Sequence, residues 1–280
     1  MSRNYCSPSK NKSSGICYDN DELIAIAKAY NNVVLKKKTI CQGNICTSTS
    51  KPINLKLSTL ELHKELSNRL GKVCSDDICW TDLDFIKTIK DKNLRDSILY
   101  FTFKPKSTKT TKSWFNTYNI NEIMQQYQDL YKNTFIFLGA QPSDFSKIIK
   151  INWKELKNKK NVGIIFNTDN HLQSGTHWLS VFIDNTNKKL DYFDSLGDLP
   201  NKNIASFLKH FKNYEFTINR TEHQKGQSAC GIYSCYFIIQ RLSGLSFSEI
   251  TDKIITDKMM TDYRSFLFRP NIKSHVIHNS

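Results

Sequence analysis

Four side chains in the second half of the sequence could together carry out acyl transfer on a thiol. In chain order they are a histidine, a carboxylate, an amide and a cysteine, namely His177, Asp194, Gln224 and Cys230. A thiol becomes a strong nucleophile beside a base, and that base works best when a third group orients it. An amide near the thiol can donate to the oxyanion that forms when a carbonyl is attacked. We therefore predict a site for nucleophilic catalysis by cysteine.

Two predicted strands bring the histidine and the carboxylate together. Residues 178–183 are aromatic, aliphatic or small, which favours a largely buried strand directly after His177. The polar run at 185–187 predicts a turn, and residues 189–194 resume as a second strand. Such a hairpin returns Asp194 to the side of His177, where the carboxylate can accept the imidazole N–H and stabilise the imidazolium.

The predicted nucleophile lies at the start of a helix. Cys230 precedes an apolar run that ends at Ser243-Gly244, which is typical of a buried helix with a glycine stop. The helix dipole and a neighbouring imidazolium both favour the thiolate. We expect Gly231 to leave room for a substrate backbone. For the amide donor, Gln227 is an alternative to Gln224 because it lies closer to the thiol in the chain.

This order and spacing resembles the superfamily of ubiquitin-like-protein proteases, which includes SUMO-specific and adenovirus proteases. The likeness is closest to the branch of the African swine fever virus polyprotein-processing protease, which is an enzyme of a large DNA virus. The resemblance is carried by His-Trp, a short hairpin to Asp-Ser, and Gln with five residues before Cys-Gly. It implies that His177 is the base, that Asp194 orients it, and that Cys230 is the nucleophile. Gln224 then holds the oxyanion, and Trp178 is the aromatic wall of the groove for the substrate's glycines.

The resemblance is strong over residues 161–244 and weaker at 119–122 and 267–269. Two positions depart from the pattern. The swine fever branch carries asparagine where Asp194 stands, which is a conservative difference. SUMO-specific proteases usually carry an acidic residue where Ala229 stands, so the choice of substrate stays open.

The fold that the resemblance implies is α+β, a papain-like or adenain-like cysteine protease core with a mixed central sheet flanked by helices. The histidine and the carboxylate would lie on the sheet and the cysteine on a facing helix. The sequence around the site fits this expectation, with predicted strands at 162–167 and 214–219 and predicted helices at 121–131 and 203–211.

Three segments are predicted along the chain. Residues 1–20 are polar and predict a disordered N-terminus, and residues 21–110 form a mostly helical N-terminal arm that includes a helix at 82–99. Lysine, threonine and proline dominate residues 103–112, which indicates a linker. We therefore assign residues 111–280 to the cysteine protease core.

The hydropathy of the sequence and its N-terminus indicate the cellular compartment and hence the redox state of the cysteines. Of the 280 residues 39% are hydrophobic, and no apolar run approaches the length of a membrane span. The N-terminus lacks the apolar segment of a secretory signal, so we expect a protein that is not secreted and whose eight cysteines are mostly reduced thiols. With the resemblance, this places it in the virion and in the host cytoplasm at virus assembly sites.

A metal site is a weaker interpretation of the cysteine spacing. Cys41 and Cys46 are separated by four residues, as are Cys74 and Cys79, and four thiolates would suit tetrahedral zinc. Structural zinc more often uses two-residue gaps, so we predict no metal.

The net charge of +14 makes nucleic acid a candidate partner. The lysines form short, scattered clusters, which usually mean solvated loops, and no nucleic-acid-binding motif is present. The related adenovirus enzyme uses DNA as a cofactor. We therefore predict that no cofactor is required and keep stimulation by DNA as an open alternative.

The leading hypothesis is a monomeric cysteine endopeptidase that cleaves after Gly-Gly in viral structural polyproteins during virion maturation. One alternative is an isopeptidase that removes SUMO or another ubiquitin-like protein from host conjugates. An alternative of another class is a non-catalytic basic protein that binds nucleic acid or a partner.

Overall fold

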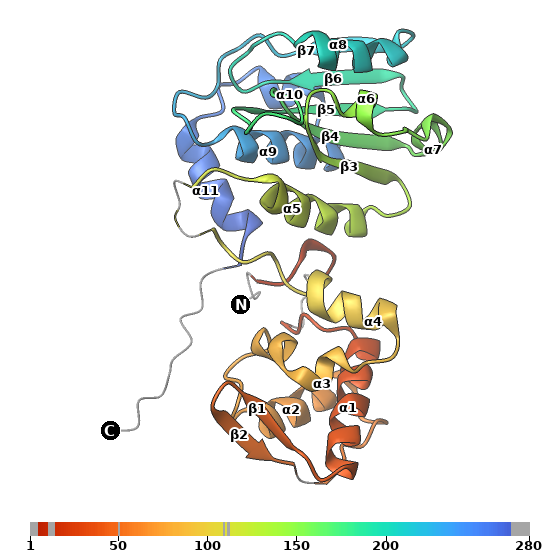
Figure 1. The fold of residues 1–280 in the computed structure, drawn as a ribbon, viewed down its shortest axis with the longest axis vertical. Coiled ribbons are helices and arrows are strands. Elements are labelled where there is room, and N and C mark those ends of the chain that lie inside the picture. Colours follow the sequence, from red (N-terminus) through yellow and green to blue (C-terminus); the bar gives the residue numbers. More distant parts are fainter. Residues whose placement is uncertain (1–4, 11–14, 50, 109, 111–112, 270–280) are drawn as a thin grey trace. The chain divides into compact units, whose positions relative to one another are not determined.

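The structure is a computed structural model that describes residues 5–10, 15–49, 51–108, 110 and 113–269. The chain divides between Lys104 and Pro105 into an N-terminal unit and a core unit (Figure 1). This division falls within the segment that the sequence marks as a linker. None of the helices formed by the described residues has the length and apolar composition of a bilayer-spanning segment.

The core unit is built on one five-stranded sheet with the spatial order β3-β4-β5-β6-β7. Its strands are β3 (Phe135–Gln141), β4 (Asn161–Asn167), β5 (Trp178–Asp184), β6 (Lys189–Phe193) and β7 (Glu215–Ile218). The two outer pairs, β3–β4 and β6–β7, are parallel, whereas β5 is antiparallel to both of its neighbours, β4 and β6. The sheet is therefore mixed, and the prediction of an α+β fold is confirmed.

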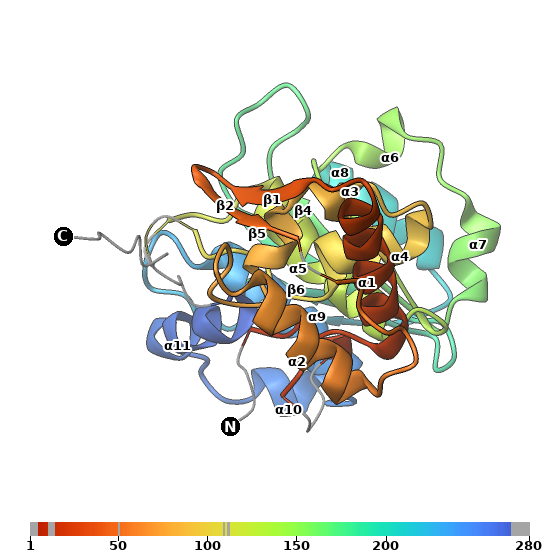
Figure 2. The same cartoon turned by 90° about the horizontal axis from the view of Figure 1, so that it is seen from below.

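Helices cover both faces of this sheet (Figure 2). One face packs against a buried cluster supplied by α5 (Thr117–Leu130), α9 (Cys230–Leu242), α10 (Phe247–Thr251) and α11 (Asp257–Leu267). The other packs against α6 (Phe145–Ile148), α7 (Trp153–Asn158) and α8 (Lys202–Leu208). Since successive side chains of a strand point to opposite faces, β5 sends Phe182 into the first cluster and Ile183 into the second. This double burial explains why β4 and β5 are mostly apolar rather than alternating.

The N-terminal unit combines helices with a small hairpin. Its longer helices are α1 (Asn20–Leu35) and α2 (Thr59–Leu70), and the hairpin pairs β1 (Thr39–Gln42) with β2 (Ile45–Ser48). The prediction of one helix over 82–99 is wrong. The chain instead forms short turns of helix: η2 (Cys79–Asp82), α3 (Asp84–Lys87), α4 (Lys92–Asp96) and the π-helical η3 (Ser97–Phe101). The interruption is local, because Leu83 is extended and the Asp91 side chain caps a new helix at the backbone N–H of Leu94.

The prediction of disorder over 1–20 is wrong for residues 5–10 and 15–20; residues 1–4 and 11–14 lie outside the described residues. Cys6 and Cys17 form a disulfide. Lys10 is buried and pairs with Glu22 at 2.9 Å, and the Tyr18 ring stacks on Trp80 with 5.5 Å between centroids. Disorder was predicted from the polar composition of this segment. The segment is nevertheless ordered, because the Cys6–Cys17 disulfide and the Lys10–Glu22 ion pair hold it in place.

The expectation of mostly reduced cysteines is also wrong. Besides Cys6–Cys17, disulfides join Cys41 to Cys46 and Cys74 to Cys79, which leaves Cys230 and Cys235 as the free thiols among eight cysteines. Cys41 and Cys46 are cross-strand partners in the β1–β2 hairpin, so local chain reversal brings them together. The four cysteines that were weighed as zinc ligands are therefore bonded in pairs.

Candidate active site

The β5–β6 hairpin brings His177 and Asp194 together as its spacing predicted. His177 immediately precedes β5, Asp194 immediately follows β6, and the two strands pair in antiparallel register from Ser180 and Phe193 onward. His177 Nε2 donates to Asp194 Oδ1 at 2.7 Å. Both side chains are largely buried, at 13% and 1% exposed. The histidine therefore has one ring nitrogen committed to the carboxylate and the other left for a reacting group.

The carboxylate is itself fixed by the loop that follows. Asp194 Oδ1 also accepts from the backbone N–H of Leu196 at 2.9 Å, and the Asn219 side-chain amide donates to the Asp194 carbonyl at 2.6 Å. The carboxylate thus has a second donor besides His177, and the backbone that carries it is anchored, so the imidazole that it binds is oriented as well.

The histidine is poised to carry a positive charge. Burial lowers the pKa of His177, but the hydrogen bonds to Asp194 and Cys230 and the negative charges of these two groups outweigh it and raise that pKa to about 10. A histidine with this pKa is protonated near neutral pH. The arrangement therefore suits an imidazolium beside a thiolate, which is the reactive state of a cysteine–histidine pair.

Cys230 is the first residue of α9, as predicted. It is 2% exposed and lies at the helix end whose partial positive charge favours an anion. The other free thiol, Cys235, is fully buried in the same helix, and burial strongly raises the pKa of Cys235. Only Cys230 therefore combines a free thiol, a helix N-terminus and a histidine partner.

Gln224 has the environment expected of a positioned amide donor, whereas Gln227 is exposed. The Ser195 hydroxyl donates to Gln224 Oε1 at 2.9 Å, and the backbone N–H of Gln224 donates to the Ser195 carbonyl at the same distance. Gln224 Nε2 donates to the Gly226 carbonyl at 2.5 Å. A side-chain amide carries two N–H donors, so one remains for a substrate oxygen.

Trp178 is held rigidly beside the site. It is the first residue of β5 and largely buried, and its indole N–H donates to the Phe115 carbonyl at 2.8 Å. Its assignment as a wall for the substrate's glycines stays a prediction, because this environment also fits a packed core residue.

The expectation that Gly231 leaves space for substrate is wrong. A Cβ built on Gly231 would lie 2.7 Å from the Phe115 Cβ, so the Phe115 side chain already occupies that space. The glycine instead permits close packing of Phe115 against the first turn of α9. Phe115 was not identified from the sequence, because this residue lies shortly after residues 103–112, which are predicted to form a linker.

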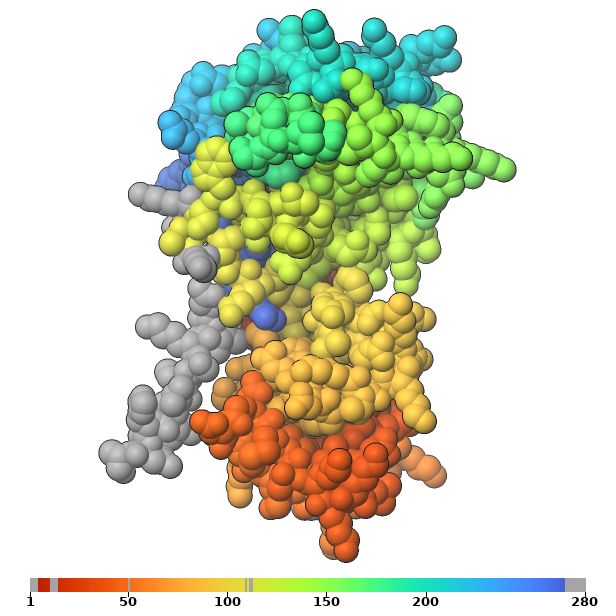
Figure 3. Space-filling model, viewed as in Figure 1, coloured from red at the N-terminus to blue at the C-terminus, as the bar shows by residue number. Residues whose placement is uncertain are grey.

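Two exposed apolar side chains lie on chain segments that connect to these residues. Trp114, next to Phe115, is 49% exposed, and Leu172 is 82% exposed. Leu172 lies in the connection between β4 and β5, where the backbone N–H of Thr168 donates to the His177 carbonyl at 2.9 Å. In Figure 3 the yellow residues after Pro105 and the green residues before β5 form a continuous surface. Trp114 and Leu172 therefore expose apolar area on segments that are hydrogen-bonded to Trp178 and His177.

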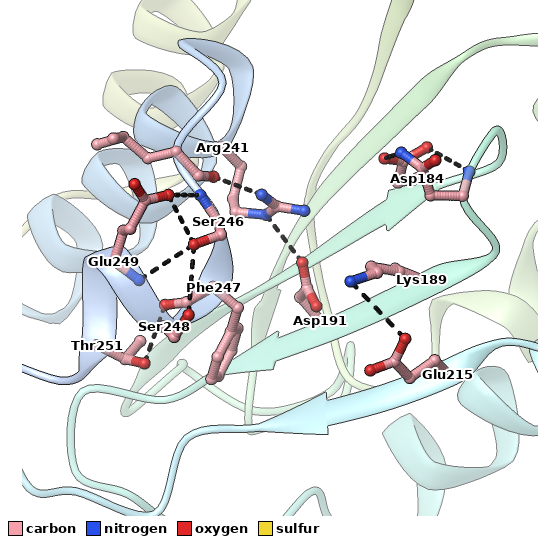
Figure 4. A network of polar contacts seen from close by, with 12 residues as sticks. Asp184, Lys189, Asp191, Glu215, Arg241, Ser246, Phe247, Ser248, Glu249 and Thr251 are labelled. Atoms are coloured by element: carbon pink, nitrogen blue, oxygen red, sulfur yellow. Dashed lines mark hydrogen bonds and ion pairs between the residues drawn. The ribbon is translucent and has the colours of Figure 1, made fainter.

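A cavity of about 720 Å³ lies at the opposite end of α9 and is separate from this site. There Arg241 reaches from the helix to β6 and donates from Nε to Asp191 Oδ2 at 2.8 Å (Figure 4). Burial raises the pKa of Asp191, and the Arg241 charge opposes that rise. Because Cys230 and Leu242 are separated by roughly 18 Å along the helix, this cavity cannot serve the thiol directly.

A mixed sheet that carries a histidine–aspartate pair, and a helix that presents a cysteine to it, are the features of a cysteine peptidase. The model of the Ulp1 protease family, C-terminal catalytic domain, matches residues 89–275, and the chain belongs to this family. It is a cysteine peptidase.

Viral proteases are among its relatives. The chain is 33% identical over 284 residues to a protein of Acanthamoeba polyphaga mimivirus that is named as a thiol protease, and the match covers 95% of this chain and 93% of that protein. It is 25% identical over 244 residues to a cysteine protease of African swine fever virus, and this match covers 75% of this chain and 89% of that protein.

The fold is similar to a crystal structure of the African swine fever virus protease. The two superpose with a TM-score of 0.61 at 22% sequence identity, over 82% of this chain and 99% of that one. The mixed sheet with flanking helices is thus the fold of this protease as well.

Proposed function

We propose that this peptidase is an endopeptidase that cleaves after Gly-Gly in viral structural polyproteins during virion maturation. The observation that carries the proposal is the 2% exposure of Cys230, whose neighbour Gly231 packs against Phe115, which in turn is bonded to the Trp178 indole. A thiol so enclosed is reached most easily by backbone without side chains, which favours glycine on the acyl side. The viral relatives support a viral substrate, processed in the virion or at cytoplasmic assembly sites.

The geometry supports the following sequence of steps. The Cys230 thiolate attacks the carbonyl carbon of the second glycine, and the carbonyl oxygen becomes an oxyanion that accepts from Gln224 Nε2 and from the Cys230 backbone N–H. The His177 imidazolium gives its proton to the departing amine, and an acyl-thioester remains on the cysteine. Neutral His177 then takes one proton from water as the water oxygen attacks the thioester carbonyl. The C–S bond breaks, which regenerates the Cys230 thiolate and the imidazolium and releases the peptide acid, whose remaining proton passes to solvent.

The exposed apolar side chains give the substrate a docking surface. We assign Trp114 and Leu172 to contacts with residues that precede the two glycines, because both are exposed and lie in segments bonded to Trp178 or His177. Exposed aromatic residues beside a catalytic site are efficient anchors for peptide side chains.

Removal of a ubiquitin-like protein from conjugates is the second candidate function. It is favoured by the African swine fever virus relatives that bear the name SUMO-1 cysteine protease. The chemical steps would be the same, since such proteins end in glycines. The two functions differ in what the surface around the site recognises.

The test compares matched substrates with the wild-type protein and Cys230→Ala. Peptides would carry Gly-Gly, Gly-Ala or Ala-Gly before the cleaved bond, and SUMO and ubiquitin fusions would carry the same junctions. We expect cleavage of Gly-Gly peptides alone, loss of all cleavage in Cys230→Ala, and no preference for the fusions. Processing of fusions at rates far above those of peptides would instead establish the second candidate. Adding DNA to each reaction tests stimulation, which stays a prediction.

A further inference from the structure

A second acidic residue, outside the histidine–cysteine motif, holds the loop that leads into the nucleophile. Asp257 is the first residue of α11. Its Oδ2 accepts from the backbone N–H of Gly226 at 2.7 Å and from that of Lys225 at 3.1 Å. Its Oδ1 lies 3.0 Å from the Tyr233 hydroxyl, which can donate to it. One carboxylate thus binds two successive backbone donors of the loop and a side chain of the helix after it.

These contacts converge on the two groups that would stabilise an oxyanion. The Gly226 carbonyl accepts from Gln224 Nε2, so fixing Gly226 also fixes the amide of Gln224. Tyr233 lies one turn after Cys230 on α9 and is fully buried. Asp257 is therefore connected on one side to the amide donor and on the other to the helix turn that carries the nucleophile.

The fit around the carboxylate is close. A Cβ built on Gly226 would lie 3.3 Å from Asp257 Oδ2, so glycine at this position lets the backbone approach the carboxylate. Hydrogen bonds from backbone N–H groups to an ionised carboxylate are shorter and stronger than those between neutral groups. An asparagine could keep both backbone bonds, because both donors bind the same oxygen and its NH₂ group could face the Tyr233 hydroxyl, whereas alanine removes all three contacts.

We infer that Asp257 is a positioning residue of this peptidase, which acts through Gly226 to aim the Gln224 amide at the oxyanion. The inference rests on the proposed role of Gln224. It predicts an effect confined to reactions that pass through an oxyanion. Peptide hydrolysis passes through one, whereas alkylation of the thiolate by iodoacetamide does not, because a carbon–sulfur bond forms as iodide leaves.

The experiment measures both reactions in Asp257→Ala, Gln224→Ala and the double variant. Removing one oxyanion donor costs about 10²–10³-fold in kcat, and misplacing it should cost on the order of 10–100-fold. We expect Asp257→Ala to lower kcat by that amount with little change in KM, while its alkylation rate stays within about twofold of wild type. Asp262→Ala is the matched control, because Asp262 lies on the same helix, is exposed and pairs with Lys258 at 3.1 Å.

The double variant shows whether the two residues act together. If Asp257 works through Gln224, the double variant should turn over no more slowly than Gln224→Ala alone. Gly226→Ala approaches the same contact from the loop side and should reproduce the loss in kcat at an unchanged alkylation rate.

Three results would overturn the inference. One is wild-type turnover in Asp257→Ala, and another is an equal loss of turnover and alkylation, which would show a disturbed Cys230 and a structural role only. The third is wild-type turnover in Gln224→Ala, which would remove the proposed role of the amide itself. The last result is distinguishable from the others, because it leaves the peptidase activity and its dependence on Cys230 intact.

Discussion

The Ser195 hydroxyl donates to Gln224 Oε1 at 2.9 Å, while Asp194, the preceding residue, binds His177 at 2.7 Å. Two consecutive residues after β6 therefore position both the base and the amide donor. His177 and Gln224 are 47 positions apart in the chain. Their relative positions are nevertheless fixed, because both are hydrogen-bonded to the same short loop.

Replacing Ser195 by alanine should release the Gln224 side chain without touching His177. We expect kcat for peptide cleavage to fall by about tenfold and the free energy of unfolding by about 1–3 kcal/mol, since the buried Gln224 oxygen loses its side-chain donor. Steady-state kinetics and denaturant unfolding measure the two effects. An alanine variant with wild-type kcat would show that Ser195 does not orient the amide.

The charge of Asp194 should be visible in the titration of His177. In Asp194→Asn the hydrogen-bond acceptor remains but the negative charge is lost, so the pKa of His177 should fall from about 10 toward the ordinary 6.5. NMR titration of the imidazole measures this shift directly, with Asp194→Ala as the variant that also loses the acceptor.

The same shift makes stability depend on pH. A histidine whose pKa is raised on folding stabilises the protein fully below its unfolded pKa, near 6.5, and the stabilisation is lost as pH rises through about 10. The stability difference between wild type and Asp194→Asn should therefore be largest near pH 6 and shrink toward pH 10.5. Denaturant unfolding across this range tests it, and a difference that does not change with pH would contradict the assignment.

The three disulfides predict how many cysteines a thiol reagent can modify. Under denaturing, non-reducing conditions a thiol reagent should modify two of the eight cysteines, and all eight after reduction. In the native state iodoacetamide should modify Cys230 far faster than Cys235, because burial holds the Cys235 thiol in its neutral form. Peptide mapping by mass spectrometry identifies the sites. Modification of Cys41 or Cys74 without reduction would show that these pairs are not bonded.

Trp114 should matter for binding more than for chemistry. Trp114→Ala removes an exposed indole from the apolar surface, so KM for peptides with an apolar residue before Gly-Gly should rise by about tenfold while kcat changes little. Phe216→Ala is the matched control, since Phe216 on β7 is aromatic and 47% exposed, close to the 49% of Trp114. An equal effect of both substitutions would remove the specific role of Trp114.

The site could be predicted best where the same apolar run that predicts a strand or helix also places a catalytic residue at its end. Apolar runs on both sides of a polar turn predicted β5 and β6, and that hairpin alone places Asp194 beside His177. Cys230 was predicted at a helix start because a glycine stop closed the apolar run. In each case the decisive contacts lie within a short stretch of chain.

Contacts between distant segments could not be predicted in this way. Nothing in the sequence near Phe115 indicates that its ring packs on Gly231, which lies 116 positions later. The role of Gly231 was misread for that reason. The N-terminal segment has the same character, because the polar residues between Cys6 and Cys17 gave no sign that Tyr18 is buried against Trp80, which lies far along the chain.

The most direct test of the active site is covalent trapping of its nucleophile. A peptide ending in Gly-Gly-vinyl methyl ester would be incubated with the wild-type protein and with His177→Gln, and the modified residue identified by mass spectrometry. We predict one adduct per chain, on Cys230, with formation slowed by at least about 100-fold in His177→Gln. An adduct on another residue, or cleavage of Gly-Gly peptides that persists in Cys230→Ala, would contradict the assignment of Cys230 as the nucleophile.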